Sequence, residues 1–229
     1  MNSATPSSGQ VTDTDTGSEV LALSLCEPIS QGRRQFIFEH PNDPSVVVKV
    51  QKPSKIKDED RYRSRRVLDR IRYGEGFTDF LREFREYIEL RTHFPQDPGD
   101  LPVCAVRGII DTDLGVGLVY ERISEPDGNM SPTLGALVKG KLTAQEHLDA
   151  LTRHFNAMSE MRVVVSNFNL LNLVYQTREN QIGRFVWIDS TGCKQTIPTR
   201  RWFKKLNDRK LRKIEAHFRA AILASLERD

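Results

Sequence analysis

Short apolar runs alternate with polar turns in the first part of the chain. Strands are expected at 20–25, 35–39 and 46–50, because each run is short and rich in Val, Ile, Leu or Phe. The segment His40-Pro41-Asn42-Asp43-Pro44 separates the second run from the third, and its prolines bracket two turn-forming residues. Together these runs predict a three-stranded antiparallel meander.

A helical period replaces this alternation further on. Apolar side chains recur at every third or fourth position along one stripe: Phe80, Phe84, Tyr87, Leu90 and Phe94. The predicted helix begins at Thr78 or Asp79, either of which can cap it, and Pro95 helps to end it. Two more strands are expected at 103–111 and 117–123.

The second half of the chain is expected to be mainly helical. The polar segment 124–129 is predicted to join it to the first half. A long helix is predicted over 143–161, where Thr143 and Glu146 have the spacing of a capping box. Its apolar stripe consists of Leu148, Leu151, Phe155, Met158 and Met161. A final basic, amphipathic helix is predicted over 202–226.

Three apolar runs lie between these helices, and polar residues stand at their ends. The run 163–165 enters a polar loop that ends at Asn172, and a second apolar run leaves it. A further strand-like run, 184–188, ends on Asp189. Polar side chains at the ends of neighbouring apolar runs are candidates for a binding site.

This order resembles the layout of a protein kinase, in which a small sheet lobe and a helical lobe are joined by a hinge. The expected class is α+β: a protein-kinase-like two-lobe fold with a small antiparallel sheet plus one helix in the N-lobe, 20–123, and a short, mainly helical C-lobe, 124–229. Residues 1–19 are polar and are predicted to form a disordered lead. Only one long helix is expected after Asp189, so the large C-terminal bundle of a protein kinase is not predicted.

Composition adds little to the class but raises the question of a partner. The chain has 229 residues, 38% hydrophobic and 28% charged, with a net charge of +3. Basic residues concentrate in 61–72 and 200–213. Such runs are typical of solvated faces, with an anionic partner (phosphate, nucleic acid or a lipid surface) as the alternative.

The cysteines and the chain's first residues bear on the compartment. The three cysteines are scattered without a CxxC pair, so neither a zinc site nor a disulfide framework is indicated. We expect a reduced, cytoplasmic setting, without a signal peptide or a membrane span.

The first candidate pair is Lys49 with Glu83. Lys49 lies inside an apolar strand, and a buried ammonium requires an anion. Glu83 falls within the apolar stripe of the predicted helix, whereas Glu86 lies at its margin and Glu89 outside it. In kinases the corresponding Lys holds the nucleotide phosphates and pairs with such a Glu. A solvent-facing Lys49, or a Glu83 paired with an Arg of the basic segment, is the structural alternative.

Asn172 and Asp189 are the candidate metal ligands. Magnesium that bridges phosphates prefers oxygen ligands, which a carboxylate and an amide carbonyl supply. The two residues follow apolar runs as kinase ligands do, although Asp and Asn also end strands simply as turn formers. The sequence after Asp189 places Gly192 one position later than the kinase Asp-Phe-Gly.

The nucleotide-contacting segments match a kinase less well. Where a Gly-rich loop is expected, only Gly32 stands beside Arg33, which either binds phosphate directly or belongs to a solvated turn. The segment containing Glu121 and Ile123 occupies the hinge position, where backbone groups can bond to an adenine edge.

Asn167 is the main departure. It occupies the place of the catalytic Asp, five residues before Asn172, and a neutral amide cannot act as a base. Since phosphoryl transfer depends mostly on positioning and charge stabilisation, losing this base slows transfer without necessarily abolishing it.

Several of these motifs together resemble the YrbL family, the PhoP-regulatory-network proteins of bacteria. The likeness runs from about Leu25 to the last helix. Its pieces are Gly32-Arg33 with His40-Pro41, Val48-Lys49-Val50, Arg82-Glu83 with Tyr87 and Leu90, Val119-Tyr120-Glu121 with Asp127-Gly128, Ser131-Pro132-Thr133-Leu134, Val164 to Asn172, Ile188-Asp189 with Gly192, and Thr196-Ile197-Pro198 before Trp202. The resemblance implies a kinase-like fold, a link to a two-component regulatory network, and nucleotide-site roles for Lys49, Glu83, Asn172 and Asp189.

Three functions remain open at this point. We favour a regulatory, pseudokinase-like protein that binds ATP and Mg²⁺. The first alternative is an active small kinase that phosphorylates a small molecule or protein. The second is a nucleic-acid-binding protein that uses the basic C-terminal helix, supported only by Trp202 and Phe203 beside the arginines.

Overall fold

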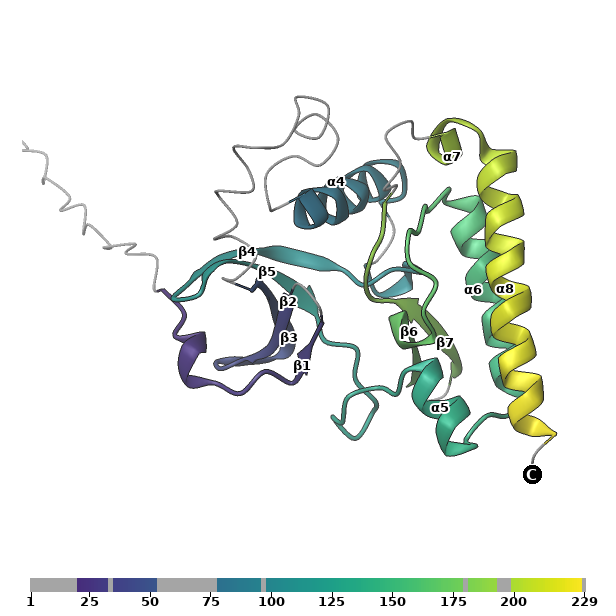
Figure 1. The fold of residues 1–229 in the computed structure, drawn as a ribbon, viewed down its shortest axis with the longest axis horizontal. Coiled ribbons are helices and arrows are strands. Elements are labelled where there is room, and N and C mark those ends of the chain that lie inside the picture. Colours follow the sequence, from purple (N-terminus) through teal and green to yellow (C-terminus); the bar gives the residue numbers. More distant parts are fainter. Residues whose placement is uncertain are drawn as a thin grey trace, which may run out of the picture.

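A computed structural model describes residues 20–32, 35–52, 78–95, 98–178, 181–192 and 199–227 (Figure 1). The predicted lead 1–19, the basic run 61–72 and the candidate phosphate ligand Arg33 lie outside these residues. No helix in the described ranges is long and apolar enough to cross a membrane.

A five-stranded antiparallel sheet forms the first part of the molecule. Its spatial order is β1 (Ser30–Gln31), β2 (Gln35–His40), β3 (Asp43–Gln51), β5 (Gly115–Glu121) and β4 (Val106–Thr112). The strands predicted at 35–39, 46–50, 103–111 and 117–123 are all present, and with the helices they confirm the α+β class. β3 is the central strand, so a side chain at its middle is covered by neighbours on both sides.

The strand predicted at 20–25 is wrong. Only Leu21 makes a strand-like bridge, to Thr112, and Leu23–Leu25 form a 3-10 turn, η1. The carboxylate of Asp113 accepts hydrogen bonds from the backbone amides of Leu23, at 2.8 Å, and Ser24, at 3.1 Å. A side chain distant in sequence thus satisfies amides that a strand would have paired. The first strand of the meander is instead Ser30–Gln31, between the runs 20–25 and 35–39.

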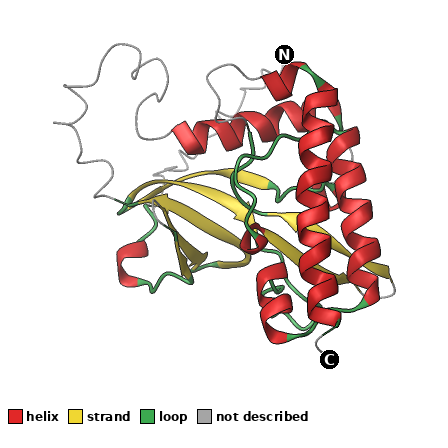
Figure 2. Cartoon of the chain, turned by 45° about the vertical axis from the view of Figure 1, so that its right-hand side comes forward, coloured by secondary structure: helices red, strands yellow, loops and turns green. Residues whose placement is uncertain are grey.

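One helix covers a face of this sheet, as predicted. It is α4 (Thr78–His93), and Figures 1 and 2 show it lying along the sheet. Phe80 packs with Val47, Leu118 and Tyr120 of the sheet in one apolar cluster. Glu83, on the same stripe of the helix, is only 4% exposed.

The rest of the chain is built around a two-stranded hairpin. The elements are η2 (Pro98–Asp100), α5 (Leu134–Gly140), α6 (Gln145–Glu160), η3 (Leu170–Asn172), β6 (Leu173–Arg178), β7 (Gln181–Trp187), α7 (Thr199–Trp202) and α8 (Lys204–Leu226). Helices α6 and α8 run side by side, and α6 packs on β7 (Figures 1 and 2). The rings of Trp187 and Phe218 stack at 6.0 Å in this core.

Three details of this half differ from expectation. Helix α5 was not predicted. Thr133 caps it, because its hydroxyl oxygen accepts a hydrogen bond from the backbone amide of Ala136. The helix predicted from Thr143 begins at Gln145, and the capping contact is a bond from the Ala144 amide to the His147 ring at 2.8 Å. The final helix is interrupted at Phe203, whose backbone is extended.

His154 is a buried, neutral histidine in the α6–β7 interface. Its Nδ1 lies 3.0 Å from the carbonyl oxygen of Phe185, and its ring stacks on Trp187. Nε2 is buried without a hydrogen-bond partner among the described residues. Burial therefore lowers the pKa of His154 from its usual 6.5 to about 4.

Acid is expected to destabilise the protein through this residue. The unfolded chain takes up a proton near pH 6.5 that the folded one resists, so the free energy of unfolding falls as the pH drops from 6.5 to 4. The full loss is on the order of 3 kcal/mol. Urea unfolding of His154→Phe across this range should show a shallower pH dependence. The exposed His217→Phe is the control, and an unchanged slope in His154→Phe contradicts this account.

Candidate functional site

Lys49 is the centre of the candidate site. It lies on β3 opposite Ile37 and Leu118, and it is 4% exposed. Its Nζ is 3.7 Å from Glu83 Oε2 and 3.3 Å from Asp189 Oδ1. It also donates a hydrogen bond of 2.8 Å to the carbonyl oxygen of Ile188. The ammonium expected from the strand pattern is therefore buried and paired.

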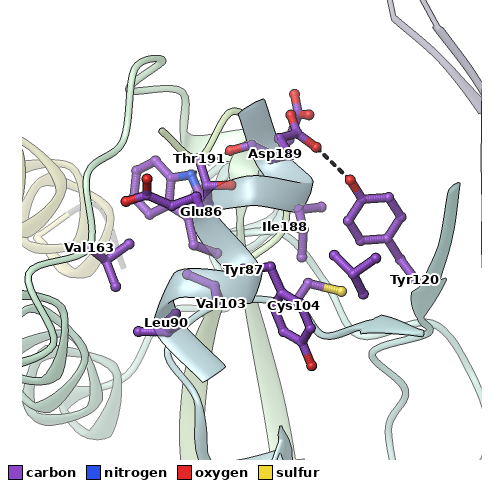
Figure 3. A pocket seen from close by; sticks show the side chains of 13 residues that line it. Glu86, Tyr87, Leu90, Val103, Cys104, Tyr120, Val163, Ile188, Asp189 and Thr191 are labelled. Atoms are coloured by element: carbon purple, nitrogen blue, oxygen red, sulfur yellow. Dashed lines mark hydrogen bonds between the residues drawn. The ribbon is translucent and has the colours of Figure 1, made fainter. Parts of the chain in front are cut away.

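Glu83 meets this ammonium from α4 and is fixed by further donors. The hydroxyl of Tyr120 donates to Oε2 at 2.7 Å, the dashed line at Tyr120 in Figure 3. The backbone amide of Ser190 donates to Oε1 at 3.0 Å. The expected contact between Lys49 and Glu83 is present, and the carboxylate connects the helix, the sheet and the segment after β7.

Tyr120 is the member of this group that sequence reasoning missed. Lys49 Nζ lies 4.3 Å from the centre of its ring, a cation–π contact that adds to the hydrogen bond to Glu83. Tyr120 pairs with Val47 across the β3–β5 ladder, so both it and Lys49 face α4. The two-residue period of paired strands indicates this face only once their register is known.

Burial and charge act in opposite directions on these ionisable groups. Burial lowers the pKa of Lys49, but Glu83 and Asp189 more than offset this and leave its pKa raised. Burial raises the pKa of Glu83, and Lys49 and Tyr120 only partly oppose it. Burial also raises the pKa of Asp189, yet Lys49 and hydrogen bonds bring it below its usual value. Lys49 therefore stays charged at neutral pH.

Asn172 and Asp189 border this group on neighbouring segments. The carbonyl oxygen of Asn172 accepts a 3.0 Å bond from the amide of Ile188, which places η3 beside the end of β7. The side chain of Asp189 is 35% exposed, and its Oδ2 accepts a bond from the Ser190 hydroxyl. Its carbonyl oxygen accepts from the Trp187 indole at 2.7 Å. The carboxylate is thus held from within and open on its other side.

The available donors suit a hard cation that shares its shell with a ligand. No group of three or more His, Cys, Asp or Glu side chains in the described ranges is placed to hold a metal. A carboxylate from Asp189 and an amide oxygen from Asn172 are oxygen donors of the kind that Mg²⁺ uses when phosphates and water complete its shell.

The other candidate residues from the sequence differ in their exposure and in the hydrogen bonds that they make. Asn167 is exposed. Its backbone carbonyl oxygen accepts a 3.5 Å hydrogen bond from the side-chain amide nitrogen of Asn172. Gly32 is exposed at the β1–β2 turn, where its amide donates to the carbonyl oxygen of Gln35. The Cys104 thiol donates to the carbonyl oxygen of Glu121 at 3.1 Å.

Some backbone groups of the expected hinge already make hydrogen bonds within the protein. Ile123 is buried, and its carbonyl oxygen accepts a 3.0 Å bond from the Ser131 amide. The carboxylate of Glu121 pairs with Arg107 and Arg184 rather than facing Lys49. An adenine edge at this segment would therefore have to share carbonyl groups that already have partners.

Further contacts fix α4, and with it Glu83. Arg201 of α7 pairs with Glu86, at 2.9 Å, and with Glu89. The Val164 amide donates to the other Glu86 oxygen at 3.3 Å. Glu86 lies at the margin of the α4 stripe and Glu89 lies outside it, as the helical projection predicts. They tie the helix to the C-terminal half.

Gly192 lies where another side chain would not fit. Its φ is +88°, and a Cβ would lie 2.5 Å from Arg82 Cγ. Arg82 Nε in turn donates to the carbonyl oxygen of Thr191 at 3.2 Å. The close approach of α4 to the segment after Asp189 therefore accounts for a glycine here.

A small pocket of about 20 Å³ lies between α4 and the end of β7 (Figure 3). Glu86, Tyr87, Cys104, Trp187 and Asp189 are among its lining residues. Its volume suits about one water molecule. Glu83 also lines it, and it is too small to hold a nucleotide.

Comparison with known proteins identifies the family. No curated protein matches the chain. The family model of the PhoP regulatory network protein YrbL matches residues 21–222, which include every described element of the site. The chain therefore belongs to the YrbL family of PhoP regulatory network proteins.

Proposed function

We propose that this protein is a regulatory module with a protein-kinase-like two-lobe fold that binds Mg-ATP and transfers phosphate weakly or not at all. The lobes correspond to residues 20–123 and 124–229, with the link at 124–129. The family's regulatory description agrees with a role in signalling.

The observation that carries this proposal is the buried ammonium of Lys49 between two carboxylates from different segments. Its contacts of 3.7 Å to Glu83 and 3.3 Å to Asp189 bring together the sheet, α4 and the end of β7. Burying the ammonium of Lys49 and the carboxylate of Glu83 is costly, and apolar side chains would stabilise the same core more simply. A retained charged cluster of this kind supports a functional role.

Lys49, Asn172 and Asp189 take the ligand-binding roles in this proposal. The ammonium attracts the nucleotide phosphates and keeps the carboxylate of Asp189 ionised. Asp189 and Asn172 would hold Mg²⁺, which neutralises phosphate charge when it is bound. Gly32 lies at the β1–β2 turn on the phosphate side in this proposal, and Glu121 and Ile123 mark the adenine side.

Asn167 is the reason to favour regulation over rapid catalysis. Its amide can orient a hydroxyl group through hydrogen bonds but cannot accept the hydroxyl's proton as a base. The ligand-binding residues do not depend on it. Nucleotide binding with slow turnover is the expected consequence, and an active small kinase is the alternative.

Mg-ATP is expected to stabilise the protein. At about 100 times its dissociation constant it should add about 2.7 kcal/mol, or raise the melting temperature by roughly 5–10 °C. Lys49→Met and Asp189→Asn should abolish this shift. The matched controls are Lys139→Met and Asp149→Asn, which change exposed residues of α5 and α6. No shift in the unaltered protein contradicts nucleotide binding.

Introducing an Asp at position 167 tests separately whether the missing base makes phosphate transfer slow. Asn167→Asp should raise phosphate release from Mg-ATP by about 10²–10⁴-fold if only the base is missing. Asn169→Asp, an exposed neighbour in the same loop, should not. Rapid phosphate transfer by the unaltered protein favours the active kinase, and no gain in Asn167→Asp despite Mg-ATP binding shows that more than the base is absent.

Removing one hydroxyl tests the role of Tyr120. Tyr120→Phe deprives the buried Glu83 carboxylate of a donor, so it should cost about 1–3 kcal/mol of stability and weaken Mg-ATP binding. Tyr87→Phe is the control, because the Tyr87 hydroxyl makes no hydrogen bond within the described ranges. Chemical unfolding gives the first quantity and titration calorimetry the second. Equal results for the two variants would mean that the hydroxyl of Tyr120 does not position Glu83.

A further inference from the structure

The corner between α7 and α8 presents apolar side chains that the core does not use. Trp202 is 62% exposed and Phe203 is 58% exposed, and Leu206, one turn into α8, is 46% exposed. The extended backbone of Phe203 breaks the helix here, so α7 and α8 meet at the outer edge of the molecule (Figure 1). Clustered large apolar side chains of this kind mark an interaction site more often than single ones.

Polar contacts on its inner side hold this corner in place. Arg200 donates to the carbonyl oxygen of Val165 at 2.9 Å. Lys204 contacts Asp208 at 2.7 Å and Ser159 at 3.0 Å. The amide of Phe203 donates to the carbonyl oxygen of Thr199 at 2.9 Å. The exposed rings therefore project from a fixed corner.

The cations beside the rings divide into paired and unpaired groups. Arg200 and Lys204 have partners within the protein. Lys205, Arg209 and Lys213 are exposed on α8 and make no ion pair within the part of the chain that the structure describes. Asp208 is the one carboxylate between residues 200 and 213, and it is engaged by Lys204. The surface thus has unbalanced positive charge next to an apolar group.

An anionic lipid bilayer fits both features at once. Lys and Arg side chains are attracted to anionic headgroups, and Trp, Phe and Leu partition into the boundary between headgroups and acyl chains. A nucleic acid would use the cations and the two rings but offers no apolar partner for Leu206. The combination of an aliphatic and two aromatic side chains with unpaired cations therefore favours the bilayer.

We propose that the α7–α8 corner is a peripheral docking surface for anionic membranes. Trp202, Phe203 and Leu206 enter the headgroup boundary, and Lys205, Arg209 and Lys213 contact the headgroups. This contact does not involve Lys49, Glu83 or Asp189, so it stands independently of nucleotide binding.

Tryptophan fluorescence provides a direct test. The chain has two tryptophans, and Trp187 is fully buried, so a shift on membrane contact reports Trp202. Vesicles containing phosphatidylglycerol should move the emission to shorter wavelength, and phosphatidylcholine vesicles should not. Trp202→Phe should remove the shift while keeping co-sedimentation, whereas Trp202→Ser should remove the shift and also weaken co-sedimentation. Leu223→Ser, an exposed position at the other end of α8, is the matched control.

A second test removes positive charge from this surface. Lys205→Gln with Arg209→Gln should weaken binding to phosphatidylglycerol vesicles by roughly 20–30-fold, since each cation near an anionic surface is worth about fivefold. Lys139→Gln should leave it unchanged. The proposal is overturned if these vesicles do not bind at low salt, or if the corner variants bind as the controls do. It is equally overturned if the corner variants lose binding of a single-stranded oligonucleotide, or self-association, in place of vesicle binding.

Discussion

The buried ammonium of Lys49 is the constraint to which the rest of the site conforms. A charge at the centre of a five-stranded sheet is stable only when anions and hydrogen-bond acceptors surround it. Glu83, Asp189 and the carbonyl oxygen of Ile188 supply them at 2.8–3.7 Å. These groups come from α4 and from the end of β7, so neutralising one charge fixes three segments that are far apart in sequence.

Much of this arrangement follows from periodicity. The apolar stripe of α4 includes position 83, so a helix that packs on the sheet must turn that carboxylate inward, toward the one cation of the facing strand. The same projection placed Glu86 at the margin, where it is mostly buried and bound to Arg201. Elements with a strong period, such as α6 and α8, were predicted within a few residues. The local pattern of apolar residues is sufficient to predict an element and its inward-facing side chains where one face of that element is buried.

Contacts between distant residues explain what the pattern did not provide. The segment 20–25 has strand-like composition, yet Asp113 binds its amides and stabilises a 3-10 turn. Tyr120 is an ordinary strand residue until the β3–β5 register brings its hydroxyl to Glu83. The cap of α6 passes from Thr143 to His147, whose ring also contacts Tyr175. The first two outcomes depend on partners that no window of local sequence contains, whereas the cap of α6 is local and reflects the choice of His147 over Thr143.

The site and the C-terminal core are mechanically connected through Trp187. Its ring stacks between His154 of α6 and Phe218 of α8, at 6.2 Å and 6.0 Å, and its indole nitrogen donates to the backbone of Asp189. The position of the Asp189 carboxylate is thus set by the same side chain that fills the helix-packed core. Because interiors are close-packed, the rings of His154 and Phe218 restrict the position of Trp187 and of the backbone that its indole binds. The packing around Trp187 therefore constrains Asp189 and, through the 3.3 Å contact of Asp189 with Lys49, the buried ammonium.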